Sequence, residues 1–323
     1  MKLFIRGLCA AGAALCCAAA LAQSAYPTKP IRLIVAYPAG SGPDVIARAM
    51  EPVLAERLRQ PVIVENRPGP GGNAGIDVVA KSAPDGYTIG LGTAGALAAN
   101  ASLYPKMPYH PVTDLAPVSN VAFVPYVLIA HPKVPASTLE EVVGLARAKP
   151  GELLIGFGGN GTAMHLASEL FKLMAQVQMV NVPYKAEGAV AQDTVAGKLS
   201  LGMVDVALAQ PQLKAGKLKA IAVTSATRIS AAPDIPTFAE SGLKDYEATG
   251  WFGIVVAART PAAIVGRLNT DIVATLKRQE VRDRIIAAGA EPAPGTPAEF
   301  GALIRAETEK WAEVVRISGA RPD

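Results

Sequence analysis

The feature that most constrains the fold is a repeated succession of an apolar run, a glycine-rich turn and a helical pattern. Residues 31–37 form a nearly continuous apolar run, which is typical of strands buried on both faces. This run ends in a turn at 38–42, and residues 43–58 then place apolar side chains at helical spacing. Because the same order returns along the chain, the sequence predicts an α/β fold with mostly parallel sheets.

Further elements expected from this alternation cover both halves of the chain. The expected strands are 61–65, 87–91, 153–157, 179–182, 199–206 and 220–224. The expected helices are 73–80, 162–174, one ending at Ala196, 262–277, 280–288 and 297–317.

Two strand-like stretches, 118–130 and 246–257, are too long for the alternation, and Pro125 interrupts the first. A length of 323 residues also favours two domains, at roughly 150 residues each. We interpret the two long stretches as crossings between two lobes with a cleft between them. The expected divisions are 26–124 with 249–323 for lobe I, 125–248 for lobe II, and a hinge near 122–128 and 246–252.

The N-terminus has the three-part pattern of a secretory signal peptide. Lys2 and Arg6 precede an apolar stretch at 8–21, and Ala20-Leu21-Ala22 is a small-residue cleavage signal. The apolar stretch is shorter than the about 20 residues that a membrane-spanning helix needs. The sequence therefore predicts a signal peptide at 1–22, cleavage after Ala22, and a periplasmic protein.

Removal of this peptide leaves no cysteine, because Cys9, Cys16 and Cys17 all lie within it. The mature chain is thus expected to have no disulfide, no thiolate nucleophile and no cysteine-bound metal. Metal-ligand spacing and a Gly-x-Ser-x-Gly nucleophile motif are also absent from the sequence. No catalytic residue, metal or cofactor is expected, although an exported α/β enzyme acting on a small anion stays an alternative.

The balance of charge argues against a nucleic-acid partner. The chain has 31 basic and 27 acidic residues, and 5% of its residues are aromatic. Nucleic-acid binding favours a clear basic excess on one face and, for single strands, aromatic stacking platforms.

Glycine, serine, threonine and asparagine gather in the turns that follow the strands. These turns are 39–42, 71–75, 93–95, 158–162 and 184–188. In open α/β sheets such turns lie where ligands bind, and helix N-termini there offer unpaired N–H groups and a partial positive charge. The pattern favours a small anion such as a carboxylate, although glycine at such turns is common in any α/β protein.

A dinucleotide-binding motif is matched by the glycines of 156–161, between a strand and a helix. Such a site also requires an acidic residue about 20 positions later, at the end of the next strand. That strand ends at 180–183 without an acid, so a dinucleotide site is not expected.

Eight segments in order make the resemblance to one family specific. They are VAYPAGSGPDVIAR, VIVENRPGPGGNAG, AKSAPDGYTIGLGT, GNGTAMHLASELFK, VPYKAEGAVAQDTVAG, KLKAIAVTSATR, PDIPTFAESG and GWFGIVVAARTP. From Tyr26 to about Ile317 the chain resembles the Bug-type, TctC-like solute-binding receptors of tripartite tricarboxylate transporters.

The resemblance implies a two-lobed periplasmic-binding-protein fold of type II, the Venus flytrap, without catalysis. It implies a monomer that captures a small carboxylate and delivers it in transient contact with membrane permease subunits, or reports it to a sensor kinase. The implied ligand-binding residues of lobe I are Ala39, Gly40, Ser41, Gly42, Asp44, Gly72, Asn73, Thr93 and Ala94. Those of lobe II are Asn160, Gly161, Thr162, His165, Tyr184 and Lys185.

The chain departs from the family pattern at three places. Gly40-Ser41-Gly42 replaces the usual first Gly-Gly loop, and Ala186-Glu187 follows Lys185 where the family has glycine. An acid that is common near Ser200 is absent there. These differences concern ligand identity and the lobe II contacts, and leave the expected fold unchanged.

Overall fold

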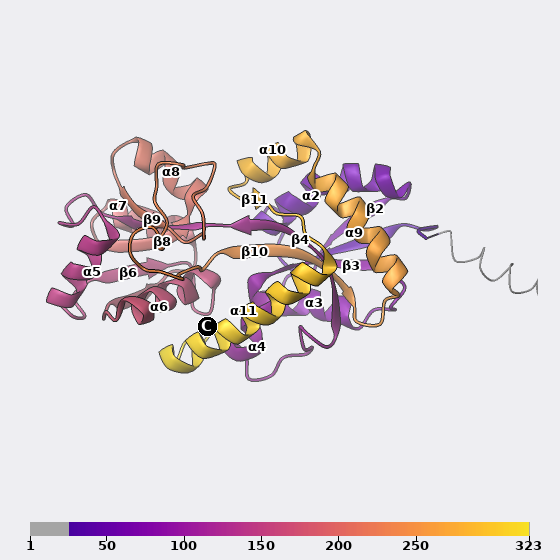
Figure 1. Cartoon of the computed structure of the whole chain (residues 1–323), viewed down its shortest axis with the longest axis horizontal. Helices are drawn as coiled ribbons and strands as arrows, with labels where there is room; N and C mark the ends of the chain where they lie inside the picture. The colour runs from indigo at the N-terminus through magenta and orange to yellow at the C-terminus, as the bar shows by residue number, and fades with distance from the viewer. Residues whose placement is uncertain (1–25, 323) are drawn as a thin grey trace, which may run out of the picture.

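Residues 26–322 are described by the structure, a computed structural model. Two separate sheets lie toward opposite ends of the long axis, each covered by helices (Figure 1). The predicted signal peptide at 1–22 lies outside the described residues. Among residues 26–322, every helix is too short or too polar to cross a membrane.

The first sheet has six strands in the order β11-β4-β10-β3-β1-β2. Its strands are β1 (Ile31–Val35), β2 (Val62–Asn66), β3 (Thr88–Thr93), β4 (Leu115–Val124), β10 (Gly250–Ala257) and β11 (Glu291–Pro292). Its helices are α2 (Gly42–Leu58), α3 (Asn73–Ala80), α4 (Asn100–Leu103), α9 (Ala262–Leu276), α10 (Gln279–Ala287) and α11 (Pro297–Ser318). Two short helical turns, η1 (Pro70–Gly72) and η2 (Gly95–Ala99), precede α3 and α4.

The second sheet has five strands in the order β7-β6-β8-β5-β9. Its strands are β5 (Tyr126–Ala130), β6 (Leu154–Phe157), β7 (Val180–Pro183), β8 (Leu201–Asp205) and β9 (Lys219–Val223). Its helices are α5 (Leu139–Ala148), α6 (Ala163–Ala175), α7 (Glu187–Val195) and α8 (Val206–Lys214).

The chain passes from the first sheet to the second at Pro125, which separates β4 from β5. Proline has no N–H for a strand ladder, so the expected single strand over 118–130 is two strands in two sheets. The chain returns through β10, which begins only at Gly250 and not at the expected residue 246. In Figure 1, β4 and β10 run side by side from the first sheet toward the second.

The predicted α/β, two-lobed fold is confirmed, but the expectation of mostly parallel sheets is wrong. In the first sheet β1 pairs in parallel with β2 and β3, whereas β10 is antiparallel to β3 and β4. In the second sheet β6 pairs in parallel with β7 and β8, whereas β5 is antiparallel to β8 and β9. The first sheet is mixed because β10 runs against both of its neighbours, and the second sheet is mixed because β5 does the same.

The core of each lobe forms where a sheet meets its helices. On the first sheet Leu33 and Val35 of β1 are fully buried, and helix α2 turns Met50 and Leu54 toward the interior. Helix α11 packs its Phe300 ring directly over Gly253 of β10, where any Cβ atom would collide with the ring. The absence of a side chain at Gly253 therefore sets how closely α11 can approach the sheet.

Candidate functional site

A cavity of about 440 Å³ lies between the two sheets and takes its walls from both. The first lobe contributes Tyr37, Ser41, Gly42, Thr93, Ala94 and Asn100. The second lobe contributes Asn160, Gly161, Thr162, Met164, Glu187 and Asp205. Tyr126, Gly250 and Trp251 line it near the two chain crossings. Residues far apart in the sequence thus converge on one cavity of a size that suits a small molecule.

The structure brings about half of the sequence-predicted site residues to this cavity. Those that line it are Ser41, Gly42, Thr93, Ala94, Asn160, Gly161 and Thr162. Those that do not are Ala39, Gly40, Asp44, Gly72, Asn73, His165, Tyr184 and Lys185. The part of all fifteen residues in ligand binding stays a prediction.

Asp44 is not part of the cavity lining and supports the turn before α2. It is 2% exposed, and its carboxylate accepts the Gly40 N–H at 2.8 Å and the Asn66 side-chain amide at 2.9 Å. Arg48, one helical turn later, donates to both carboxylate oxygens at 3.0 Å. Burial opposes ionisation of Asp44, but these hydrogen bonds hold its pKa below the ordinary value. The carboxylate is therefore engaged by the protein itself and fixes the shape of the turn at 38–42.

Asn100 supports the second turn of this wall and was not expected from the sequence. Its side-chain amide donates to the Gly71 carbonyl at 2.9 Å and to Oδ1 of Asn73 at 2.7 Å. The Tyr109 hydroxyl approaches the same Asn73 oxygen at 3.3 Å. Asn73 is thus a buried connector, while Asn100 reaches the cavity.

On the opposite wall, Thr162 caps the N-terminus of α6. Its Oγ1 accepts the N–H of His165 at 3.3 Å and donates to the Gly159 carbonyl at 2.9 Å. The first hydrogen bond satisfies one of the N–H groups that a helix N-terminus leaves unpaired. The second holds the glycine-rich turn against the start of the helix.

His165 lies behind that turn, stacked on Phe157 with ring centroids 4.5 Å apart. Its Nδ1 accepts the Gly161 N–H at 3.0 Å, and its Nε2 faces Oε1 of Glu169 at 3.5 Å. Burial alone would raise the pKa of Glu169, but hydrogen bonds with His165, Lys172 and Asn181 lower it to about 2. His165 therefore links the cavity turn to a buried, charged network on α6.

Tyr184 and Lys185 lie outside the cavity lining. The Tyr184 hydroxyl donates to Oδ2 of Asp193 at 2.9 Å, and Lys185 is exposed. The residue of this turn that reaches the cavity is Glu187, the first residue of α7.

Asp205 is the second acidic residue of the wall, and sequence reasoning missed it. Ser200 precedes β8, where no acid was found, whereas Asp205 is the last residue of that strand. The backbone N–H of Asp205 donates to Oε2 of Glu187 at 3.4 Å, and burial is the main cause that raises the pKa of both carboxyl groups. The sequence feature that could have predicted Asp205 is its position at the carboxyl end of an expected strand, where ligand sites form in α/β sheets.

No Lys, Arg or His side chain is among the described residues that line the cavity. A bound anion would instead meet the N-terminal ends of α2, at Ser41 and Gly42, and of α6, at Thr162. Helix N-termini bind anions through unpaired N–H groups and the positive end of the helix dipole. The cavity thus combines the positive ends of two helices with an acidic wall, which is formed by Glu187 and Asp205.

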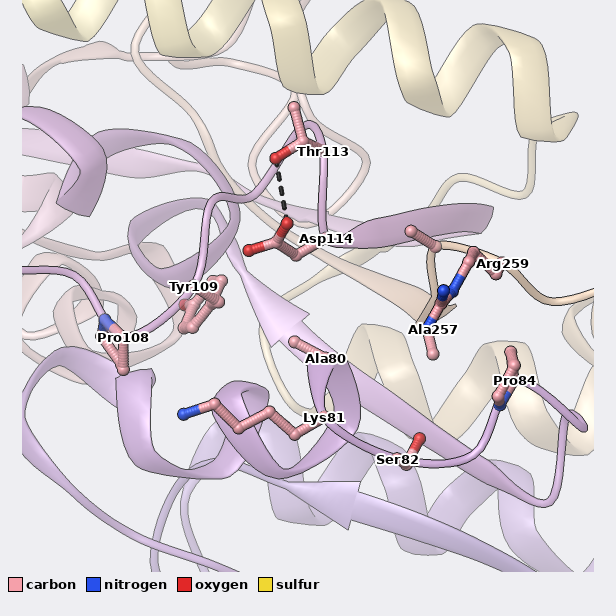
Figure 2. Close-up of a pocket in the computed structure, with 11 residues that line it drawn as sticks. Ala80, Lys81, Ser82, Pro84, Pro108, Tyr109, Thr113, Asp114, Ala257 and Arg259 are labelled. Carbon is pink, nitrogen blue, oxygen red and sulfur yellow. Dashed lines mark hydrogen bonds between the residues drawn. The ribbon is translucent and has the colours of Figure 1, made fainter.

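A second pocket, of about 340 Å³, lies within the first lobe alone (Figure 2). Lys81 and Ser82 line it after α3, and Arg259 lines it after β10. Thr113 and Asp114 complete it, joined by a hydrogen bond of 3.0 Å. No residue of the second sheet contributes to this pocket, so a movement of the lobes would not enclose a ligand there.

A two-lobed α/β fold with helix N-termini from both lobes on one cavity defines a solute-binding protein. Within residues 26–322, no cluster of three or more His, Cys, Asp or Glu side chains is arranged to hold a metal ion. The comparisons with known proteins agree with this class. The family model "Tripartite tricarboxylate transporter family receptor" (TctC) matches residues 46–319, and the chain belongs to this family. It is a family of solute-binding receptors and not of enzymes.

Individual relatives match nearly the whole chain. The chain is 36% identical to Protein BugT of Bordetella pertussis over 305 residues, which are 94% of each chain. It is similar to the solved structure of Rpa4515 from R. palustris with adipate, at 34% identity, a TM-score of 0.77, and coverage of 93% of this chain and 100% of that one. It is also similar to MatC from Rhodopseudomonas palustris with bound malate, at 29% identity, a TM-score of 0.73, and coverage of 90% and 100%. The family supports a periplasmic location.

Proposed function

We propose that this receptor captures a small carboxylate in the cavity between its lobes and hands it to the membrane subunits of a tripartite tricarboxylate-type transporter. The observation that carries the proposal is the pair of helix N-termini, of α2 and α6, on opposite walls of a cavity whose described lining residues include no cationic side chain. The adipate and malate in the two neighbouring structures support a carboxylate as the ligand class.

The proposed capture step is closure of the lobes. We take lobe I as 26–124 with 249–323 and lobe II as 125–248, with the hinge near 122–128 and 246–252. Because the two helix N-termini belong to different lobes, a carboxylate that meets both is held best when the lobes are closed. The ligand then favours closure through its higher affinity for the closed form. The working unit is a monomer released by cleavage after Ala22.

The test is a thermal-shift screen of residues 23–323 against mono-, di- and tricarboxylates, amino acids and aromatic acids. A ligand present at 100 times its dissociation constant stabilises the folded state by about 2.7 kcal/mol. A shift confined to carboxylates, with the ligand recovered unchanged, supports the proposal. Absence of a shift on protein refolded to remove copurified ligand would overturn it, and turnover of a bound ligand would indicate an enzyme.

A further inference from the structure

The acidic wall of the cavity is a built feature of the second lobe. Glu187 begins α7 and Asp205 ends β8, and both line the cavity. The aliphatic part of Glu187 lies over Gly158, where a Cβ atom would come within 2.8 Å of its Cγ. Because position 158 carries no side chain, Glu187 can cross the turn and meet the backbone N–H of Asp205.

One oxygen of this wall lacks a donor. Oδ1 of Asp205 is buried and has no hydrogen-bond partner among the described residues. A buried acceptor of this kind is costly unless a donor reaches it. The donor within reach is a proton shared between the Asp205 and Glu187 carboxyl groups, and the pair that shares it still has more acceptors than donors.

The described residues that line the cavity beside Glu187 and Asp205 provide no opposite charge. Asp205 lies directly across from Tyr126 of β5 in the strand ladder. Burial first, and then the nearby Asp205 and Glu187 carboxyl groups, raise the pKa of the Tyr126 phenol, which keeps it neutral. None of the described residues lining the cavity is a cation, so a second ligand carboxylate at this wall would face two carboxyl groups without compensation.

We propose that Glu187 and Asp205 are the specificity-determining pair of the cavity, and that they select a carboxylate whose far end carries a hydroxyl or ammonium donor over a dicarboxylate. The inference rests on the proposed function, because one end of the ligand must first be held as a carboxylate by the helix N-termini. A donor at the other end meets the acceptors of the Glu187 and Asp205 carboxyl groups that line the cavity, whereas a second carboxylate adds an acceptor where acceptors already exceed donors. The preferred ligand thus differs in its far end from the adipate and malate of the neighbouring structures.

The test uses two matched ligand series with calorimetric titration of the mature protein. The first series is adipate, 6-hydroxyhexanoate and 6-aminohexanoate, and the second is succinate, 4-hydroxybutanoate and 4-aminobutanoate. Within each series one end is constant and only the far end changes. We expect the best donor-ended member to bind at least tenfold more tightly than the dicarboxylate of the same length.

Two conservative variants test whether Glu187 and Asp205 cause this preference. Glu187→Gln and Asp205→Asn each replace a carboxyl group by an amide with its own N–H donors at nearly constant shape, so the preference should fall to threefold or less while dicarboxylate affinity rises. Glu152→Gln, an exposed position in the same lobe outside the cavity lining, is the matched control and should keep the wild-type preference. If Asp205→Asn does not fold, the result for Glu187→Gln decides alone.

The outcomes separate the two proposals. Equal or tighter binding of the dicarboxylates to the wild-type protein, or an unchanged preference in the variants, overturns the specificity role while leaving carboxylate capture standing. Failure of every member of both series, together with the wider carboxylate panel, overturns the proposed function and the specificity role with it.

Discussion

Nδ1 of His165 accepts the backbone N–H of Gly161 at 3.0 Å, four residues earlier in the chain. Gly161 lines the cavity, but its N–H is occupied by the protein and is not available to a ligand. An accepting Nδ1 places the ring proton of the neutral imidazole on Nε2, which faces Glu169. His165 therefore acts on the site from behind, by holding the turn from which Thr162 and its neighbours face the cavity.

Replacing His165 by Phe should loosen this turn while retaining an aromatic ring against Phe157. Loss of the acceptor leaves the Gly161 N–H unpaired, which costs on the order of 1 kcal/mol and weakens ligand binding by about tenfold. Hydrogen exchange of the 158–162 amides and calorimetric titration measure the two effects. His131→Phe is the control, because His131 accepts a backbone N–H in a loop away from the cavity. Unchanged exchange at 158–162 would contradict the role given to His165.

Thr162→Ala should separate stability from binding when it is compared with Thr138→Ala. Both threonines cap a helix N-terminus of the second lobe, but only Thr162 lines the cavity. Loss of either cap should lower the free energy of unfolding by about 1 kcal/mol. Only Thr162→Ala should also weaken the ligand, as urea denaturation and titration of both variants will establish. An equal loss of affinity in the two variants would show that binding follows stability alone.

Glu169 should contribute stability that disappears in acid. Its pKa is lowered from 4.5 to about 2, so its stabilisation is complete above the unfolded-state pKa and is lost as the pH falls from about 5 toward 2. Glu169→Gln should therefore be less stable at pH 7 by on the order of 2–3 kcal/mol and should show a flatter loss between pH 5 and 2. Urea denaturation across this range tests both, with the exposed Glu152→Gln as a control that should change little. Parallel curves for wild type and Glu169→Gln would be the contrary result.

Alanine should have opposite effects at two glycines. At Gly253 the added Cβ collides with the Phe300 ring and forces α11 away from the sheet, which should cost about 1–3 kcal/mol. At Gly144, on the exposed face of α5, the Cβ meets no atom within 4 Å, so alanine should stabilise by about 0.5–1 kcal/mol. The midpoints of urea unfolding give both signs. A stable Gly253→Ala variant would mean that α11 can shift without loss of packing.

The sequence predicted the position of the site better than its chemistry. The turns at 39–42, 93–95 and 158–162 all reach the cavity, because a glycine-rich turn after a buried strand is a local pattern. Which side chain of a turn faces the ligand, however, is not determined by the local sequence. In the turn at 184–188 the hydroxyl of Tyr184 bonds Asp193, and Glu187 faces inward in its place.

Asp205 and the mixed sheets escaped prediction for the same reason. Asp205 gains its place through pairing of β8 with β5, and the direction of β5 is set by the chain crossing at Pro125. Hydrophobic periodicity identifies a strand but does not show which distant strand lies beside it, or in which direction. The two-lobed fold could be predicted, whereas the strand pairings could not.

The position of β10 between β3 and β4 determines the order in which a growing chain can complete its two sheets. Both neighbours of β10 have been synthesised by residue 124, yet the strand that joins them arrives only at 250–257. Until then β3 and β4 each keep an unpaired edge, and their partner must be brought across more than one hundred intervening residues. The second sheet, in contrast, has all of its strands by residue 223. The lobe that opens the sequence is therefore the last to have all of its strands available for pairing.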